Sequence, residues 1–392
     1  MTRPADGAAW DLAPEGPRPG AQAAFAFELL ARDGAARAGR FHTPHGTVET
    51  PAFMPVGTQA AVKALSSAEV RQAGVEIVLA NAYHLYLRPG ADVVAGAGGL
   101  HRFMRWEGPI LTDSGGYQVF SLADLARVDE DGVTFRSHLD GSSHRFEPEG
   151  VVDLQRELGS DVAMPLDHCL ANPAERSEAR DAVQRTLRWL ERSLLRAREL
   201  DARGQGGPQA LFGIVQGATF ADLRRESARA TRGFDLPGVA VGGLAVGEPN
   251  EELHAMLEVV EPELDPRRPR YLMGVGFPAD LVRAIARGMD LFDCVAPTRH
   301  GRNGTLFTSE GRINIRNSAY RQDHGPLDPA CACAACAATS RAYLSHLFHA
   351  REILGPRLAT YHNVVFLSDL MQRARAAIAA GRFATWAELA AR

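Results

Sequence analysis

The chain has 392 residues and a formal net charge of −4, from 43 Lys and Arg against 47 Asp and Glu. That balance argues against a protein coated in positive charge, such as a general nucleic-acid binder. With 45% apolar and 23% charged residues, the composition excludes a wholly disordered, collagen-like or coiled-coil chain. The length suits a large α/β barrel with an elaboration.

Three features of the sequence bear on where the protein is located: its N-terminal residues, its apolar runs and its cysteines. Residues 1–20 are rich in proline and glycine and contain no apolar segment that could serve as a secretory signal, so we predict a disordered tail. No apolar run approaches the roughly 18 residues that a membrane-spanning helix requires. The five cysteines are too few and too clustered for a disulfide framework. We therefore expect a cytoplasmic protein.

A repeating pattern of short strands and helices follows the tail. Residues 25–53 are predicted to be extended, with a turn at His45 and Gly46. Eight apolar segments rich in β-branched or aromatic residues then alternate with helical stretches, as in a parallel βαβ array. The predicted strands are 53–57, 75–81, 109–113, 161–167, 210–216, 238–243, 271–274 and 291–295, and the predicted helices are 67–73, 175–200, 221–231, 250–260 and 278–287. Residues 129–144 are predicted to form a β insertion.

These elements predict an α/β fold, a closed (β/α)8 TIM barrel with a zinc-binding subdomain inserted after the eighth strand. We expect four regions: the tail (1–20), the catalytic barrel (21–304), the zinc-binding insertion (305–364) and a C-terminal helical region that packs on the barrel (365–392). In such a barrel the chemistry lies at the C-terminal ends of the strands. Several of the predicted strands end in a polar residue or a glycine, which would lie at this end of the barrel.

Two of those strand ends carry carboxylates with suggestive neighbours. Asp113 begins the sequence DSGGYQ, whose glycines allow a tight turn and a close backbone approach to a ligand. Asp293 precedes PTRHGRNG, an expected glycine-containing loop whose arginines suit a polyanion. Two carboxylates at one barrel mouth can break a glycosidic bond, one as nucleophile and one as proton carrier. The structural alternative, that Asp113 is a cap and Asp293 pairs with Arg299, is equally open at this point.

A cysteine cluster in the insertion predicts a metal site. Cys331, Cys333 and Cys336 supply three thiolates, and a histidine would complete a closed tetrahedral Zn²⁺ site. His346 and His349 lie nearby, but His362 is preferred because it follows a helical segment from which it could return to the cluster. Four protein ligands leave no open position for water, so the predicted zinc, one per chain, is structural.

The motifs also occur together in a familiar order. The sequence resembles the bacterial tRNA-guanine transglycosylases, of the queuine tRNA-ribosyltransferase family. The resemblance rests on the motifs DSGGYQ, MPLDHC, FGIVQG, GGLAVGE, YLMGVG and FDCVAPTRHGRNG and on the C-x-C-x2-C cluster with its distant histidine. The resemblance runs from about residue 25 to the C-terminal region. It implies a homodimeric pentosyltransferase with no membrane association that acts on tRNA.

The resemblance further implies a particular reaction. Such enzymes exchange the wobble guanine of tRNAs with a GUN anticodon, those for Asp, Asn, His and Tyr, for 7-aminomethyl-7-deazaguanine in queuosine biosynthesis, by covalent double displacement. By motif, Asp293 is similar to the nucleophile and Asp113 to the general acid/base. The implied substrate-binding residues are Ser114, Gly115, Gly116, Tyr117, Asp167, Gln216, Gly243, Leu244 and Met273, with Tyr117 and Met273 sandwiching the base.

Further positions correspond to RNA and metal contacts of the family. The implied RNA-binding residues are Gly274, Val275, Gly276, Phe277, Pro278, Ala279, Asp280, Thr298, Arg299, His300, Gly301 and Arg302, and the implied zinc ligands are Cys331, Cys333, Cys336 and His362. Val246 and Cys169 favour the bacterial aminomethyl substrate. The chain departs from the family pattern at His168, where Glu is usual, and at His300, where Asn is usual.

Two other functions fit some of these observations. A barrel glycoside hydrolase could use the same two aspartates but would not explain the cysteine cluster or the arginines. A non-catalytic RNA-binding subunit of the same family would not need both Asp113 and Asp293. Residues 267–321 contain ten arginines and four acidic residues, a local charge of +6 that the overall −4 conceals. This local excess favours RNA binding beside Asp293.

Overall fold

The computed structural model describes residues 24–122 and 127–390, so the tail predicted for residues 1–20 lies outside the described residues. The described chain begins with an antiparallel sheet of β1 (Phe27–Asp33), β2 (Ala36–Thr43) and β3 (Gly46–Thr50), as the extended prediction for 25–53 requires. Phe41 and Val48 from this sheet are buried in one apolar cluster with Phe212 and Leu291 of the barrel. The small sheet therefore covers the N-terminal end of the barrel, which we call the floor.

All eight predicted barrel strands are present and parallel. They are β4 (Ala52–Gly57), β5 (Val78–Asn81), β6 (Ile110–Asp113), β10 (Val162–Ala163), β11 (Ala210–Leu211) with β12 (Gly213–Val215), β13 (Val239–Val241), β14 (Arg270–Leu272) and β15 (Leu291–Cys294). The fifth predicted strand is interrupted at Phe212. Its two halves pair with opposite neighbours, β11 with β10 and β12 with β13, so this one segment closes the circle. The predicted (β/α)8 barrel is confirmed.

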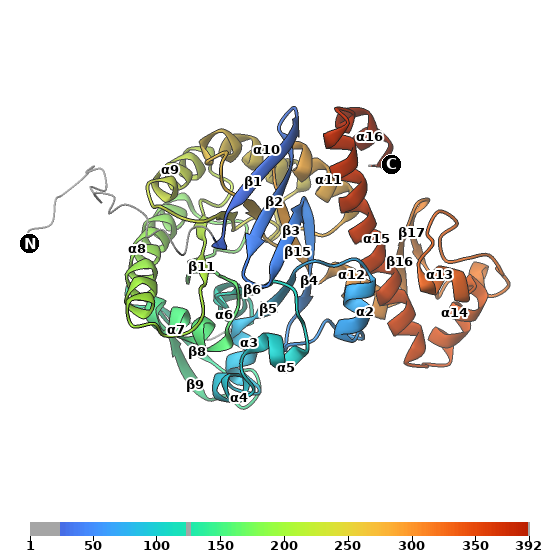
Figure 1. The fold of residues 1–392 in the computed structure, drawn as a ribbon, viewed down its shortest axis with the longest axis horizontal. Coiled ribbons are helices and arrows are strands. Elements are labelled where there is room, and N and C mark those ends of the chain that lie inside the picture. Colours follow the sequence, from blue (N-terminus) through green and yellow to red (C-terminus); the bar gives the residue numbers. More distant parts are fainter. Residues whose placement is uncertain (1–23, 123–126, 391–392) are drawn as a thin grey trace, which may run out of the picture.

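Helices surround the barrel (Figure 1). The five predicted helices correspond to α2 (Ser67–Gln72), α8 (Arg176–Ala202), α9 (Ala221–Arg232), α10 (Asn250–Val260) and α11 (Pro278–Ala286). Additional helices are α3 (Ala82–Leu87), α4 (Ala91–Gly96), α5 (Leu100–Met104), α6 (Gly116–Leu122) and α7 (Pro148–Leu158), and a 3-10 turn, η1 (Glu261–Glu263), follows α10. The predicted β insertion is the sheet of β7 (Arg127–Val128), β8 (Val133–Arg136) and β9 (Ser143–Phe146).

A smaller unit follows the eighth strand and projects from the barrel (Figure 1). It contains β16 (Thr305–Thr308), β17 (Gly311–Asn314), η2 (Ser318–Tyr320), α13 (Ala334–Ala338) and α14 (Arg341–His349). The long helix α15 (Leu354–Ala379) then returns along the barrel and is followed by α16 (Phe383–Ala390). Because α15 runs without a break through residues 364 and 365, the small unit and the C-terminal region share one helix. Leu367, Leu370 and Met371 of α15 are buried in the main apolar cluster of the barrel.

The segment after Asp293 differs from the expected loop. Residues Ala296–Arg302 form helix α12, with a proline in its first turn. Gly301 lies against α15, where an added Cβ would come within 2.7 Å of the Thr360 Cα atom. The glycine that suggested a loop is therefore used for close helix packing. Within residues 24–122 and 127–390, no helix is both long enough and apolar enough to cross a membrane.

Candidate functional site

Polar side chains converge at the C-terminal ends of the barrel strands, which we call the mouth. Asn81 and Asp113 are paired neighbours in the register of β5 and β6. The Asp113 carboxylate accepts hydrogen bonds from Asn81 Nδ2 at 2.6 Å, Gln118 Nε2 at 3.3 Å and the Ala82 backbone N–H at 3.0 Å. Every one of these donors is neutral. The backbone bond ties Asp113 to the start of α3, which precedes it in the chain, whereas the structural alternative had Asp113 capping the segment that follows it.

Burial raises the pKa of Asp113 to about 7, and the nearby charge of Asp293 adds to the rise while the Ala82 N–H opposes it. The two carboxylates therefore interact electrostatically across the mouth. Repulsion between the two carboxylates makes ionisation of both unfavourable, so the pair favours the state in which one is an anion and the other keeps its proton. Near neutral pH the pair thus holds one anion and one carboxylic acid.

Asp293 is half-buried at the end of β15. Its Oδ1 atom accepts hydrogen bonds from the Tyr271 hydroxyl at 2.6 Å and from the Gly274 backbone N–H at 2.8 Å. Loss of water raises its pKa, and these two hydrogen bonds oppose the rise by stabilising the anion. Its partners are neutral groups rather than the Arg299 guanidinium of the structural alternative. Both bonds fix Oδ1, which leaves Oδ2 as the atom suited to nucleophilic attack.

A third carboxylate, Asp167, is paired with Gln216 and is buried. Gln216 Nε2 donates to Asp167 Oδ2 at 2.6 Å, and Ser114 Oγ lies 3.5 Å from Oδ1. Burial raises the pKa of Asp167 to about 6, with the Gln216 hydrogen bond opposing the rise. A carboxylate and an amide placed edge to edge present both acceptors and donors, as a purine edge requires.

Glycines bring the backbone close to these side chains. Gly243 has φ of +61°, and a Cβ there would come close to Gln216 Oε1. A Cβ at Gly116 would lie 2.9 Å from Asp167 Oδ1. Arg224, fully buried, donates to the carbonyls of Gly242 at 2.6 Å and Gly243 at 2.8 Å and so fixes this backbone. Glycine at these positions therefore lets the backbone approach Gln216 and Asp167 more closely than a residue with a Cβ could.

The predicted base-stacking and RNA-contacting residues differ in their exposure to solvent. Tyr117 is 50% exposed, Met273 is half-buried, and Leu244 is buried. In α12, Arg299 is exposed and His300 and Arg302 are half-buried, whereas Thr298 and Gly301 are buried beneath them. Phe277, just before α11, contacts His300 with ring centroids 5.4 Å apart and carries the Arg312 guanidinium 5.2 Å above its ring.

His168, where the family pattern has Glu, is held from α8. Its backbone N–H donates to Thr186 Oγ1 at 3.0 Å, and Arg185 donates to its Nδ1 at 2.9 Å. Burial lowers the pKa of His168 to about 4, and the Arg185 charge adds to the shift. The ring is therefore neutral at physiological pH, and beside Asp167 it supplies no negative charge.

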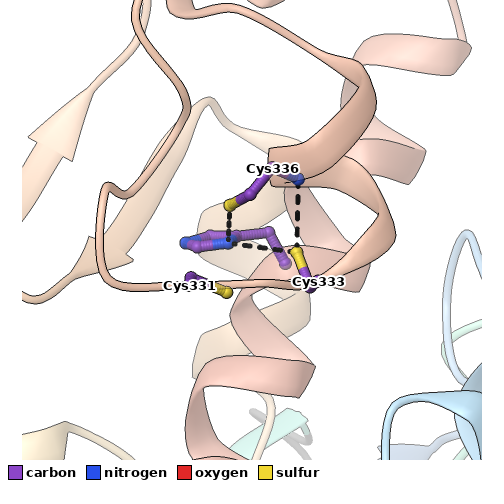
Figure 2. A group of neighbouring side chains, drawn as sticks. Cys331, Cys333 and Cys336 are labelled. Atoms are coloured by element: carbon purple, nitrogen blue, oxygen red, sulfur yellow. Dashed lines mark hydrogen bonds between the residues drawn. The ribbon is translucent and has the colours of Figure 1, made fainter.

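The cysteine cluster gathers in the small unit, as Figure 2 shows. His362 Nδ1 lies 3.3 Å from Cys336 Sγ and 3.7 Å from Cys333 Sγ, and the ligand atoms of Cys331, Cys333, Cys336 and His362 all lie within 4.8 Å of one another. His362 Nε2 lies 2.7 Å from the Phe307 carbonyl oxygen, which requires the ring proton on Nε2 and leaves the Nδ1 lone pair free. These four residues can bind a metal ion. The His362 prediction is favoured over His346 and His349 by this geometry.

The sequence does not indicate the roles of four side chains at the mouth, those of Asn81, Gln118, Arg224 and Tyr271. Tyr271 lies at the start of the YLMGVG motif, but its hydrogen bond to Asp293 spans two strands and is set by the barrel register. Asn81 ends the predicted strand 75–81, and nothing in its local sequence indicates the hydrogen bond to Asp113. Arg224 lies in a helix whose arginines suggest a solvated surface, and only its complete burial reveals the role.

The fold and site together define an α/β-barrel enzyme with paired carboxylates at its mouth and a Cys3His metal centre. The sequence model of the family described as queuine tRNA-ribosyltransferase matches residues 33–392. Similar proteins called queuine tRNA-ribosyltransferase include one from Herpetosiphon aurantiacus, 55% identical over 359 residues (92% of this chain and 90% of the relative), and one from Moorella thermoacetica, 55% identical over 361 residues (92% and 95%). Another, from Symbiobacterium thermophilum, is 53% identical over 365 residues (93% and 90%). The chain belongs to the queuine tRNA-ribosyltransferase family, which confirms the resemblance.

Proposed function

We propose that this protein is a tRNA-guanine transglycosylase that exchanges the wobble guanine of GUN-anticodon tRNAs for 7-aminomethyl-7-deazaguanine. The observation that carries this proposal is the pair Asp113 and Asp293, each held by neutral donors at one barrel mouth and coupled so that one is acidic while the other is charged. Membership of the family supports it. The expected tRNA substrates are those for Asp, Asn, His and Tyr.

In the first step, Asp293 Oδ2 attacks the ribose anomeric carbon of the wobble nucleotide while the bond from that carbon to guanine breaks. Asp113 gives its proton to the departing base, which leaves as neutral guanine. The ribose is then an ester of Asp293. Tyr271 and the Gly274 N–H hold Oδ1 throughout and keep the carboxylate aimed.

In the second step the deazaguanine enters the same pocket. Asp113, now an anion, takes the proton from the ring nitrogen of the incoming base, which attacks the anomeric carbon and releases Asp293. Asp113 regains the proton it gave, so the cycle closes without an external acid. Exclusion of water matters because hydrolysis of the ester would leave an abasic tRNA.

Base recognition is proposed for Asp167, Gln216 and the Gly243 backbone, with Tyr117 and Met273 on the two ring faces. An anticodon-loop base is already single-stranded, so extracting it costs only about a few kcal/mol, which hydrogen bonds to its edge can offset. The strand-to-helix stretch 274–280 and α12 are proposed to hold the flanking phosphates. Binding should then weaken with salt, by a slope of about −0.7 per neutralised phosphate on a log-log plot.

We propose that the Cys3His centre holds one structural Zn²⁺. Thiolates and imidazole in a closed four-ligand set suit zinc, and the centre ties the small unit to α15. Metal analysis should find about one zinc per chain, and Cys336→Ser should lose it with a clear fall in thermal stability. A zinc-free wild-type protein of unchanged stability would refute this role.

From the sequence we propose that this unit spans residues 305–364, and that α15 is shared between it and the C-terminal region. We also propose that the protein is a cytoplasmic homodimer.

One exchange assay tests the function. The folded protein is incubated with tRNA-Tyr or tRNA-Asp and labelled guanine, and label in the tRNA is measured. Incorporation supports a transglycosylase. Binding of tRNA without incorporation would indicate the non-catalytic subunit, and neither binding nor incorporation would favour the glycoside hydrolase; either result would refute the proposal.

A further inference from the structure

A second cluster of metal-binding side chains lies on the floor, at the opposite end of the barrel from the catalytic mouth. His45 occupies the turn between β2 and β3, His101 lies in α5, and Asp161 immediately precedes β10. The three residues come from segments far apart in the sequence. Neither the exchange reaction nor the Cys3His centre uses any of them.

The carboxylate of Asp161 is the fixed centre of this cluster. Its side chain is completely buried, its Oδ2 accepts the Ile110 backbone N–H at 2.9 Å, and its own backbone bonds to Ile110 and Ala210 on both sides. Burial alone would raise the pKa of Asp161, but hydrogen bonds from His101 and His45 lower it below the usual value. The carboxylate is therefore ionised, as a metal ligand must be.

The two imidazoles both aim a ring nitrogen at this carboxylate. His45 Nδ1 lies 2.8 Å from Oδ1 and His101 Nε2 lies 3.1 Å from Oδ2. The rings are stacked with centroids 3.5 Å apart and an angle of 16° between their planes. One potential ligand atom from each residue lies within 4.8 Å of the other two. A small tilt of the stacked rings would direct both nitrogens and one oxygen at a single ion.

The three side chains of the cluster differ in their exposed fraction, and the more exposed side gives a metal ion access to the site. The His45 side chain is 44% exposed and that of His101 is 13% exposed, whereas Asp161 is sealed. An ion could approach past His45 and retain water on that side. Two imidazoles and one carboxylate with an open position form a donor set suited to Zn²⁺ and neighbouring divalent transition metals rather than to Mg²⁺ or Ca²⁺.

We propose that His45, His101 and Asp161 form an accessory Zn²⁺ site that joins the β2–β3 turn and α5 to the barrel floor. Coordination requires the two nitrogens that face Asp161 to carry no proton, so each bound ring carries its proton on the other nitrogen, His45 Nε2 or His101 Nδ1. The ion then replaces two hydrogen bonds with three coordination bonds. The site lies at the opposite end of the barrel from the mouth, so we expect its loading to change stability rather than the exchange reaction.

The test is a zinc titration of the full-length protein already carrying its Cys3His metal. Equilibrium dialysis against Zn²⁺ should show one further zinc per chain, and thermal unfolding should move to higher temperature as it binds. In His45→Gln and His101→Gln the second affinity should fall by more than the roughly 10–100-fold that loss of an outer-shell partner causes. His42→Gln is the matched control, because His42 lies on β2 beside this turn but contacts Thr47 and Glu28 instead.

Cobalt distinguishes this site from the cysteine centre. Co²⁺ bound by nitrogen and oxygen ligands should give a visible spectrum without the thiolate charge-transfer band of a Cys3His centre. His45→Gln, at an exposed turn, is expected to fold, which its thermal unfolding without added metal will verify. No second zinc in the wild type, or an equally tight second zinc in both glutamine variants, would overturn the proposal.

Discussion

The two ends of the barrel both hold buried or half-buried carboxylates but surround them differently. At the mouth, Asp113 and Asp293 accept hydrogen bonds from amides, a phenol and backbone N–H groups, all of them neutral. On the floor, Asp290 lies 3.3 Å from the buried Arg37 guanidinium, and Asp161 is held by two histidines. The same residue type therefore meets neutral donors at one end and ionisable or cationic partners at the other.

This difference separates reactivity from stability. A neutral donor orients a carboxylate without cancelling its charge, so the group can still attack a carbon or exchange a proton. A permanently charged partner makes the charge part of the folded structure, and removing one member leaves the other buried and uncompensated. Substitutions at the mouth should thus reduce activity with little change in folding, and those on the floor should do the reverse.

The largest expected effect is at the nucleophile. Asp293→Asn keeps the shape and a hydrogen-bond acceptor but removes the attacking anion, so guanine exchange should fall by about 10⁴-fold or more. Thermal unfolding should stay close to wild type because no charged partner is stranded. Measured exchange within about tenfold of wild type would contradict the assigned role.

Asp113→Asn should lower exchange by about 10²- to 10⁴-fold, the usual contribution of a general acid or base. It should also change the pH dependence. In the wild type the acid form of Asp113 is lost as pH rises through about 7, so guanine release in a single turnover should decline above that pH. The asparagine variant should lack this alkaline decline, and an unchanged profile would assign it to another group.

On the floor, Asp290→Asn should destabilise the protein by about 3 kcal/mol, because Arg37 loses its buried counter-charge. Chemical denaturation would measure the loss, while exchange per folded molecule should remain near wild type. Replacing both residues with apolar ones, as in Arg37→Met with Asp290→Leu, should recover much of the stability. If the single variant were as stable as wild type, the floor pair would not have the proposed role.

The smallest expected effect is at a residue that positions the nucleophile. Tyr271→Phe removes the 2.6 Å hydrogen bond to Asp293 and should lower the turnover rate by about 10–100-fold. Because that bond stabilises the anion, its loss raises the pKa of Asp293, and the acid limb of the pH–rate profile should move to higher pH. A uniform rate loss with an unmoved acid limb would indicate a merely structural role.

The helices and strands that depend on local sequence patterns were mostly predictable from the sequence. The barrel strands were recognisable from their β-branched and apolar runs, and α10 matches its predicted bounds of 250–260 because its apolar spacing and flanking proline are local signals. Helices α3, α4 and α5 are only five or six residues long, too short for a periodic signal. The segment that forms α12 has the composition of a loop, because the role of Gly301 depends on packing against the distant Thr360.

The site residues show the same distinction between features set by local sequence and features set by long-range contacts. Asp113 and Asp293 were identifiable as strand-end carboxylates, but the donors that set their pKa values come from neighbouring strands. The pairing of Tyr271 with Asp293 depends on barrel register, and the choice of His362 depends on how α15 approaches the cysteines. The histidines of the floor cluster carry no local motif, because Asp161 lies more than 50 residues from either in the chain.

The central claim, that the mouth carboxylates act by covalent double displacement, is tested most directly by trapping the intermediate. The protein is incubated with a GUN-anticodon tRNA without a replacement base, denatured, and separated by gel electrophoresis. The wild type should give a protein–tRNA adduct that survives denaturation, and Asp293→Ala should give none. An adduct of undiminished yield in Asp293→Ala would contradict the account.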